Sequence, residues 1–490
     1  MTGYIASVLK SEHIDTEIVD ANLFGWSFQK TVEELKRRNF SLLGVHLLYL
    51  WEDTDSLFEM LFNLRKEGIC AHINLYGHFP TFAFRDILFY YPFIDSVTVG
   101  EPELTILELA EKIVTSRKRA ILHVIDGLVF HSWSTEDKNG NESNGRNLVG
   151  KEPDVGKKRP EIIENKPRSV VSRLDTFPFP FRHHYDLFKK KGIASYILGS
   201  RGCYGSCTFC YLDRFYGENS SWRGRSPENV FEEVYDLYQK FGERYFYFAD
   251  ANFFGPGKKG KERAGKFARF IIEKGLKIEF GIECRVNDIE ADSLSLLVKA
   301  GLKEVFLGVE NGSQNSLNRF NKMTTVEENK KAICMLRHHK IEPNYGFIMF
   351  EPGSTLGDVR ESFEFLKKMK MLRKPDITAH LLYHQQTLFK GMPDYEKRKD
   401  HAESISKFNY EYCNKLNDRK VSLLAERVNY FCLKVLSELS RTKDDQIWHD
   451  SCHYDEEDSF SMELNEKLIN HFEETLCSLE KVSQREVQVL

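Results

Sequence analysis

Residues 200–211 read SRGCYGSCTFCY and bring three cysteines, Cys203, Cys207 and Cys210, into one short stretch. Three thiolates this close together in one loop can hold an iron–sulfur cluster. Because a [4Fe–4S] cube normally takes one Cys thiolate on each of its irons, a loop with only three ligands leaves one iron open for another molecule. The stretch therefore predicts a metal centre that reserves one coordination site for chemistry.

Simpler explanations exist for the same cysteines: an incomplete zinc knuckle, a disulfide pair with a spare thiol, or coincidence. Zinc sites favour paired C-x2-C knuckles with a fourth ligand, and no further CxxC or HxxxH partner stands nearby. Scattered single cysteines are typical of buried apolar residues rather than of a disulfide framework, which indicates a reducing, intracellular compartment. The remaining cysteines are Cys70, Cys284, Cys334, Cys413, Cys432, Cys452 and Cys477.

Length and composition are those of an ordinary globular protein. A length of 490 residues is enough for about three domains. The composition, 41% hydrophobic and 29% charged, is ordinary for a globular protein. A net charge of -4 and a pI near 6.5 indicate no basic face for nucleic acid. No apolar run approaches the roughly 20 residues that span a bilayer, and the N-terminal MTGY lacks the start of a secretory signal. We expect a cytoplasmic enzyme with no nucleic-acid partner and no membrane span.

Short β-rich runs alternate with amphipathic segments up to about residue 115. This alternation predicts a parallel α/β sheet, whose ligands sit at the carboxyl ends of the strands. The turns expected at that edge are residues 46–51, 77–81 and 100–103. The β-rich runs are Glu17–Asp20, Leu42–Leu48, His72–Gly77 and Asp95–Gly100.

The next segment, residues 116–192, is predicted to be a connector. Its stretch at about 132–167 is rich in Asn, Gly, Lys and Glu and is too polar to bury much surface, which indicates a flexible insertion. The segment LDTFPFP, residues 174–180, is expected to be extended, because proline fixes φ and blocks helix formation.

Strands and helices alternate again over residues 193–390, which predicts a βα-repeat barrel or partial barrel. Active sites of such barrels lie at the C-terminal ends of the strands. Residues 391–490 are charged, with apolar positions at helical spacing, and predict a helical cap. The expected barrel strands are residues 194–198, 245–248, 278–282, 304–309 and 346–350.

The cysteine loop closely resembles the C-x3-C-x2-C loop of the radical S-adenosylmethionine (SAM) enzymes, including Phe209, the aromatic residue before the last cysteine. In that superfamily the amino and carboxylate groups of SAM fill the open site of a [4Fe–4S] cluster. The resemblance implies that Cys203, Cys207 and Cys210 are the catalytic cluster ligands and that SAM is cleaved reductively to a 5′-deoxyadenosyl radical. It also implies an electron donor such as a flavodoxin or ferredoxin.

Further turns resemble those that contact SAM in the same superfamily. The turn ADANFF would place Asp250 and Asn252 beside the SAM amino group, although Asp-x-Asn is also ordinary turn chemistry. Arg285 would hold the SAM carboxylate with its fork, and a surface ion pair explains it equally well. The turn GVENGSQ resembles the family's GVESGSQ and would place Glu310 against the ribose hydroxyls. Ile348, on the last motif, would pack on the adenine.

The N-terminal turns resemble the cobalamin-binding domain that precedes the barrel in one radical SAM subgroup. The imperfect matches YGHFPT and GEPE would bring Gly77, His78, Thr81, Gly100 and Glu101 to cobalamin, although His78 alone also fits a plain turn. No D-x-H-x-x-G motif occurs, so no histidine is expected to replace cobalamin's own base. The resemblance begins at the first helix of that domain, and the preceding strand is expected to be missing from the sheet.

Residues 222–230, WRGRSPENV, resemble the W-R-x-R-S-P segment of the same cobalamin-type enzymes. Ser226 before Pro227 also fits a simple helix cap. Each motif is weak singly, but their order over roughly 200 residues makes coincidence improbable.

The resemblance implies an α/β fold with a Rossmann-like cobalamin-binding-type domain at 1–115, a partial (β/α)6 TIM-type barrel at 193–390 and a helical C-terminal region at 391–490. The implied activity is that of a class B radical SAM methyltransferase. The radical takes hydrogen from an unactivated carbon of a small-molecule or peptide substrate, and methylcobalamin delivers the methyl group. Two alternatives stay open: radical rearrangement, cyclisation or oxidation without methyl transfer, and a noncatalytic iron–sulfur protein.

Overall fold

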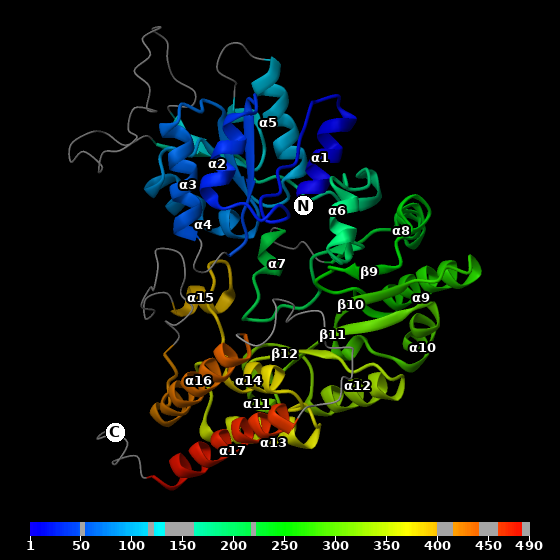
Figure 1. The fold of residues 1–490 in the computed structure, drawn as a ribbon, viewed down its shortest axis with the longest axis vertical. Helices are drawn as coiled ribbons and strands as arrows, with labels where there is room; N and C mark the ends of the chain where they lie inside the picture. Colours follow the sequence, from blue (N-terminus) through cyan, green and yellow to red (C-terminus); the bar gives the residue numbers. More distant parts are fainter. Residues whose placement is uncertain are drawn as a thin grey trace, which may run out of the picture. The chain divides into compact units, whose positions relative to one another are not determined.

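The computed structural model describes residues 1–49, 54–115, 122–132, 161–216, 222–398, 415–440 and 459–482. The chain divides into two compact units (Figure 1). The first unit comprises residues 1–193 and 214–220, and the second unit comprises residues 194–213 and 221–490. Within the described ranges, every helix is too short or too polar to cross a membrane.

The first unit contains a five-stranded sheet in the order β1-β2-β3-β4-β5. The first three strands are parallel, whereas β4 and β5 each run antiparallel to the strand before them. The three parallel strands fall within predicted β-rich runs. The strands are β1 Leu42–His46, β2 His72–Tyr76, β3 Ser96–Thr98, β4 Leu128–His131 and β5 Ile162–Glu164.

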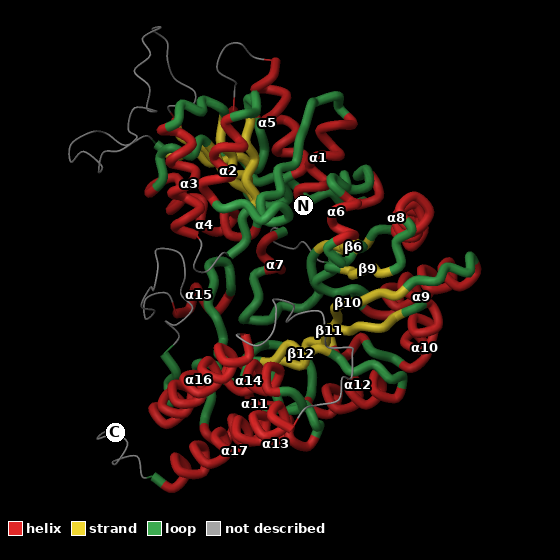
Figure 2. The backbone as a smooth tube through the Cα atoms, viewed as in Figure 1, coloured by secondary structure: helices red, strands yellow, loops and turns green. Residues whose placement is uncertain are grey.

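Helices flank this sheet (Figure 2). One core cluster joins α1 to α5 through Ile5 and Leu9 on one side and Ile106 and Ala110 on the other, with Tyr76 of β2 between them. The apolar positions of both helices therefore face one another at one side of the strands. The helices are α1 Thr2–Ser11, α2 Phe28–Lys36, α3 Thr54–Lys66, α4 His78–Tyr90, α5 Glu103–Thr115 and α6 Tyr185–Lys190.

Three predictions for the first unit need correction. Residues 174–180 are not extended throughout as predicted, because Leu174–Thr176 form a short 3-10 helix that ends before the first proline of the segment. The run Glu17–Asp20 forms no strand, because β-propensity is weak without a paired neighbour and β1, at the end of the described sheet order, pairs with β2. Residues 162–164, placed in the flexible insertion, instead form β5, since Ile162 and Ile163 pair with β4. Residues 133–160 of that insertion lie outside the described residues.

The second unit is built on a parallel sheet in the order β12-β11-β10-β9-β6. A single parallel bridge between Phe350 and Gln385 lies beyond these strands. Each predicted barrel strand overlaps one of the five. The strands are β6 Ser195–Ile197, β9 Tyr245–Phe248, β10 Glu279–Arg285, β11 Leu302–Glu310 and β12 Asn344–Phe347, and a small antiparallel pair joins β7 Ser200–Arg201 to β8 Arg223–Gly224.

The residues of β9, YFYF, show why the sheet has one apolar face. Side chains alternate along a strand, so Phe246 and Phe248 point to the helical layer and are buried, whereas Tyr245 and Tyr247 face the other side. Phe248 packs on Phe267 of α9 with ring centroids 5.3 Å apart. Aromatic packing between strand and helix thus fixes one face of the sheet, and the tyrosines leave the other face more polar.

The helices of the second unit begin at defined caps. The Ser226 hydroxyl accepts from the Asn229 amide at the start of α8, where Pro227 is the first helical residue, so the expected cap is confirmed. Thr325 and Thr355 start α12 and α13 with reciprocal capping boxes. The helices up to this point are α8 Pro227–Phe241, α9 Gly257–Glu273, α10 Ala291–Ala300, α11 Gln314–Arg319, α12 Val326–His338 and α13 Leu356–Lys368. The short helix α7 Leu212–Phe215 has residues in both units.

Past the last strand, the described chain is helical. Phe472 of α17 packs on Phe363 of α13 with centroids 4.7 Å apart, and α14, α16 and α17 contact one another. These helices extend the core beyond the edge of the sheet. They are α14 Pro375–Tyr383, α15 Pro393–Arg398, α16 Arg419–Ser440 and α17 Ser459–Lys481.

Gly301 is the residue at which the chain leaves α10 for β11. Its φ is 114°, and a Cβ there would overlap the Ile278 carbonyl oxygen. We expect Gly301→Ala to lower the free energy of unfolding by more than about 2 kcal/mol, from steric overlap added to left-handed strain. Gly275→Ala is the matched control, because its φ is also positive but no atom lies within 4 Å of the added Cβ. Equal losses in denaturant unfolding would contradict this explanation.

Candidate functional site

The cysteine loop follows β7 and is tied by its backbone to two distant segments. The Thr208 amide donates to the Phe320 carbonyl at 2.9 Å, and the Thr208 carbonyl accepts from the Asp394 amide at 3.1 Å. The Asn321 side chain donates to the Ser206 carbonyl at 2.9 Å. The loop is therefore held in shape by the segments that follow α11 and begin α15.

The three thiols lie in an environment that suits thiolates bound to a metal cluster. Arg285 Nη1 donates to Cys207 Sγ at 3.4 Å, and the Gly205 amide donates to Cys203 Sγ at 3.4 Å. Burial raises the pKa of Cys210 to about 12, with the nearby Cys207 and Cys203 adding to the effect. A metal would therefore be needed to hold Cys210 as a thiolate.

In the part of the chain that the structure describes, no three His, Cys, Asp or Glu side chains converge to hold a single metal ion. A [4Fe–4S] cube places each cysteine on a different iron, so its ligands need not meet at one point. The three cysteines and their donors thus fit a cluster, and cluster ligation stays a prediction.

The guanidinium of Arg285, at the end of β10, donates hydrogen bonds to groups of the protein itself. Its Nη2 donates to the Lys322 carbonyl, its Nη1 reaches Cys207, and its guanidinium lies 5.5 Å from the centroid of the Tyr204 ring. Only 6% of Arg285 is exposed. The guanidinium therefore braces the cysteine loop, and the surface ion pair considered for it does not form among the described residues. Its contact with the SAM carboxylate stays a prediction.

Asp250 is fully buried at the end of β9. Its carboxylate accepts from the Gly199 amide at 3.1 Å and from the Ser200 hydroxyl. Burial raises the pKa of Asp250 to about 6, against the opposing effect of Arg263. The carboxylate fixes the chain just before the cysteine loop.

Asn252 is also fully buried. It donates to Asp288 at 2.6 Å and accepts from the Gly255 amide at 2.7 Å. Neither Asp250 nor Asn252 reaches an open surface, so a direct bond to SAM would require local rearrangement. Their observed partners give both residues a positioning function, and the predicted contact with the SAM amino group is untested.

Glu310 ends β11 and forms a buried ion pair that the sequence did not predict. Lys322 Nζ donates to Glu310 Oε1 at 2.7 Å, and the two side chains are 4% and 11% exposed. A Cβ on Gly308 would lie 2.7 Å from Glu310 Oε1, so glycine leaves the space for this pair. Glycine is also present at the paired position on β12, Gly346.

The backbone around this ion pair is strained. Glu310, Asn321 and Met323 all adopt positive φ, at 64°, 50° and 56°. Non-glycine residues in this region cost free energy and are concentrated at functional sites. Lys322 lies between Asn321 and Met323, in a turn that none of the sequence motifs includes. A lysine near two predicted site residues became visible as a candidate only through the fold.

Ile348 and Phe209 complete the candidate SAM site. The Ile348 amide donates to the Glu310 carbonyl at 2.7 Å, and its own carbonyl accepts from the Asn311 side chain at 2.8 Å. Phe209 packs edge-on against Phe320 with ring centroids 5.1 Å apart. Two apolar side chains are thus held on the segments that carry Glu310 and the cysteines.

The predicted N-terminal turns come together in the first unit. The Thr81 hydroxyl donates to the Gly77 carbonyl at 2.7 Å and accepts from the Gly100 amide at 3.0 Å, so one side chain bridges the turns after β2 and β3. Burial lowers the pKa of His78 to about 4, and its ring packs edge-on against Phe215 at 4.3 Å. Glu101 is buried. All five predicted residues lie at the carboxyl edge of this sheet.

Residues 197–366 match the family described as the radical SAM superfamily. An uncharacterized methyltransferase of Pyrococcus horikoshii is 26% identical over 377 residues, 75% of this chain and 72% of that protein. The anaerobic magnesium-protoporphyrin IX monomethyl ester cyclase of Cereibacter sphaeroides is 27% identical over 419 residues, 83% of this chain and 62% of the cyclase.

Among solved structures, the cobalamin-dependent S-adenosylmethionine radical enzyme OxsB with aqua-cobalamin bound has a TM-score of 0.72 at 19% identity, covering 100% of this chain and 71% of OxsB. The α/β fold of this chain, with its helical part, is thus similar to that of a cobalamin-dependent radical SAM enzyme. The family match includes the segment with the three cysteines and the strand ends that surround it. Residues 197–366 therefore form a radical SAM domain, and enzymes with this domain work with a [4Fe–4S] cluster and SAM.

Proposed function

We propose that this enzyme uses SAM and cobalamin to transfer a methyl group to an unactivated carbon of a small molecule or peptide. The observation that carries the proposal is the loop of Cys203, Cys207 and Cys210, tied to the segments beside Glu310 in a fold similar to a cobalamin-bound enzyme. The relative named as a methyltransferase supports the reaction type. When bound, the cluster and SAM supply a 5′-deoxyadenosyl radical and cobalamin supplies the methyl group.

The proposed ligands of the cluster are the three cysteines. Arg285 and the Gly205 amide donate to two of their sulfurs, and hydrogen bonds to ligand sulfurs tune the reduction potential of such clusters. We expect a one-electron donor such as a flavodoxin or ferredoxin as the partner, in the cytoplasm.

The proposed ribose contact is Glu310. Lys322 orients its carboxylate and balances its charge in a buried position, where an unpaired carboxylate is costly. Ile348 and Phe209 offer apolar contact to the adenine side of SAM. Asp250 and Asn252 are proposed to position the backbone around the site, because each side chain accepts a hydrogen bond from a backbone amide.

The first unit is proposed to be a Rossmann-like cobalamin domain. Gly77 and Gly100 bring backbone close to the ligand, with φ values of 119° and 80°. Thr81 fixes their spacing, and His78 and Glu101 stand in the same turns. Ligands of parallel sheets bind at this edge.

A second candidate function is radical cyclisation, rearrangement or oxidation without methyl transfer. It is favoured by the similarity to a relative named as a cyclase, which covers 83% of this chain. The deciding experiment is anaerobic turnover with SAM, reductant and cobalamin, followed by mass analysis of candidate substrates. A mass gain of one methyl group, which shifts when SAM carries a deuterated methyl, supports methyl transfer. A product with an altered skeleton and no added carbon refutes it in favour of the second candidate.

Cluster ligation predicts the effect of single cysteine substitutions. Cys203→Ala, Cys207→Ala and Cys210→Ala should each lose most cluster iron and reduce 5′-deoxyadenosine formation to background, because a [4Fe–4S] cube then has too few protein ligands. Cys334→Ala is the control, because Cys334 is exposed on α12. Iron and sulfide analysis after anaerobic reconstitution is the measurement. Normal iron content in all three variants would exclude the proposed cluster.

The buried ion pair predicts a stability difference between two lysines. Lys322→Met leaves Glu310 buried without its partner and should lower the free energy of unfolding by about 3–5 kcal/mol. Lys330→Met is the control, because its pair with Glu327 is 29% and 80% exposed and such pairs contribute about 1 kcal/mol or less. If both variants lost the same free energy of unfolding in denaturant titrations, the buried pair would stabilise the protein no more than the exposed pair does.

The bridge made by Thr81 predicts the cobalamin affinity of the full chain. Thr81→Val removes both hydrogen bonds and should weaken cobalamin binding by roughly tenfold, in line with one buried polar group left unsatisfied. Thr31→Val is the matched control, since the Thr31 hydroxyl also donates to a carbonyl four residues earlier. Cobalamin retained per chain after gel filtration gives the result. If Thr81→Val retained as much cobalamin as the wild-type protein, the proposal that these turns bind cobalamin would be wrong.

A further inference from the structure

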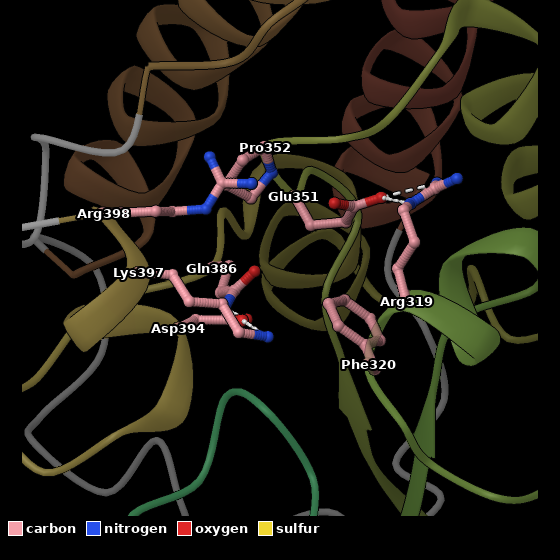
Figure 3. A pocket seen from close by; sticks show the side chains of 8 residues that line it. All are labelled: Arg319, Phe320, Glu351, Pro352, Gln386, Asp394, Lys397 and Arg398. Atoms are coloured by element: carbon pink, nitrogen blue, oxygen red, sulfur yellow. Dashed lines mark hydrogen bonds and ion pairs between the residues drawn. The ribbon is translucent and has the colours of Figure 1, made fainter. Parts of the chain in front are cut away.

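The second unit contains a cavity of about 350 Å³ whose lining includes none of the residues proposed to hold the cluster, SAM or cobalamin. It lies between the end of α11, the loop after β12 and the helix α15 (Figure 3). Its volume lies within the range of small-molecule sites. The lining residues are Arg319, Phe320, Glu351, Pro352, Gln386, Asp394, Lys397 and Arg398.

The cavity adjoins the cysteine loop on two sides. Phe320 packs on Phe209, the residue before Cys210, and the Phe320 carbonyl accepts from the Thr208 amide. Across the cavity, the Asp394 amide donates to the Thr208 carbonyl. A molecule bound here therefore touches the same two segments that hold the cluster ligands in place.

The two carboxylates of the cavity already have protein partners. Glu351 accepts from Arg319 at 2.6 Å through one oxygen and from the Gly353 amide at 2.6 Å through the other. Asp394 accepts from the Gln386 side chain at 2.8 Å. Figure 3 shows these two pairs on opposite sides of the cavity. Both carboxylates therefore already have hydrogen-bonding partners within the protein.

Lys397 and Arg398, two cations that line the cavity, have weaker interactions with carboxylates than Arg319 has. Both come from the last turn of α15. Within the described residues, Arg398 has no hydrogen bond or ion pair, and its guanidinium extends toward Pro352 (Figure 3). Lys397 Nζ lies 3.9 Å from Asp394, and its side chain is 67% exposed. Among the described residues, Arg398 therefore presents a positive charge without a counter-ion, and Lys397 forms only a long ion pair with Asp394, opposite the apolar ring of Phe320.

We propose that this cavity binds the anionic group of the substrate, a phosphate, phosphonate or carboxylate, with the apolar part of the molecule against Phe320 and Pro352. A guanidinium fork matches such anions with two parallel hydrogen bonds, and Lys397 adds a second cation. This inference rests on the proposed function, because it names the class of substrate for the same active site. The substrate is an organic anion.

The test measures binding of small probes to the reconstituted full chain by isothermal titration calorimetry. Phenyl phosphate and benzoate carry the two candidate anions on an apolar ring, and benzyl alcohol is their neutral counterpart. We expect one or both anions to bind and benzyl alcohol not to bind. The stronger anion identifies which acid the substrate carries.

The double variant Lys397→Gln/Arg398→Gln should weaken binding of the better anion at least tenfold. The double variant Lys258→Gln/Arg269→Gln is the control, because it removes the same charges from α9, which does not line the cavity. Circular dichroism checks that each variant is folded. Unchanged affinity in the α15 variant, equal losses in both variants, or equal binding of benzyl alcohol would overturn the proposal.

Failure of this inference can be told apart from failure of the proposed function. Probe binding needs neither SAM nor reductant, whereas 5′-deoxyadenosine formation by the wild-type protein needs both. SAM cleavage without anion binding refutes the substrate class alone. Anion binding with an intact cluster but no SAM cleavage refutes the proposed function and leaves the anion site in place.

Discussion

A buried carboxylate holds the beginning of the cysteine loop, and the rest of the active site depends on it. Asp250 accepts from the Gly199 amide and the Ser200 hydroxyl with no exposure to solvent. Burying a carboxylate is costly unless its oxygens are bonded, so these contacts pin the chain where β6 gives way to the loop. Arg263, which donates to the Gly199 carbonyl at 2.6 Å, supplies a nearby positive charge. The cysteines follow within a few residues of this anchor, which fixes where a cluster can sit.

The other end of the loop is fixed by segments distant in sequence. Phe320 and Asp394 bond the backbone of Thr208 from opposite directions. The same Phe320 precedes the turn that carries Lys322, the partner of Glu310. A few hydrogen bonds therefore connect the cluster loop, the proposed ribose contact and the cavity of α15. A substrate bound in that cavity would contact Phe320 and Asp394, which hold the backbone of the cysteine loop.

Much of the fold was predictable because periodic patterns report local geometry. The alternation in β9 and the runs at β1, β2, β10 and β11 identified strands, and the cysteine spacing identified the loop on which the family resemblance depends. Glu17–Asp20 was misassigned because a strand requires a neighbour, which no local pattern reveals. β5 was missed because residues 162–164 lie in a polar stretch whose pattern does not indicate the pairing with β4.

The site was predictable only where its residues belong to a motif. Glu310 and the cysteines do, whereas Lys322 and Phe320 acquire their meaning from partners brought near by folding. Asp250 and Asn252 illustrate the opposite limit: a motif gave their position on the strand end but not the intramolecular bonds that occupy them. Sequence pattern locates a residue on an element, and only packing decides which of its atoms remain available.

The absence of side chains at Gly308 and Gly346, paired on neighbouring strands, has a broader consequence. At this level of the sheet the wall beside Glu310 is formed by peptide groups, which no substitution can vary without adding bulk. Chemical diversity among enzymes built this way must then arise elsewhere, in loops and terminal helices such as α15. In this chain the backbone beside Glu310 leaves little room for change, whereas the loops and terminal helices around it can differ without filling that space.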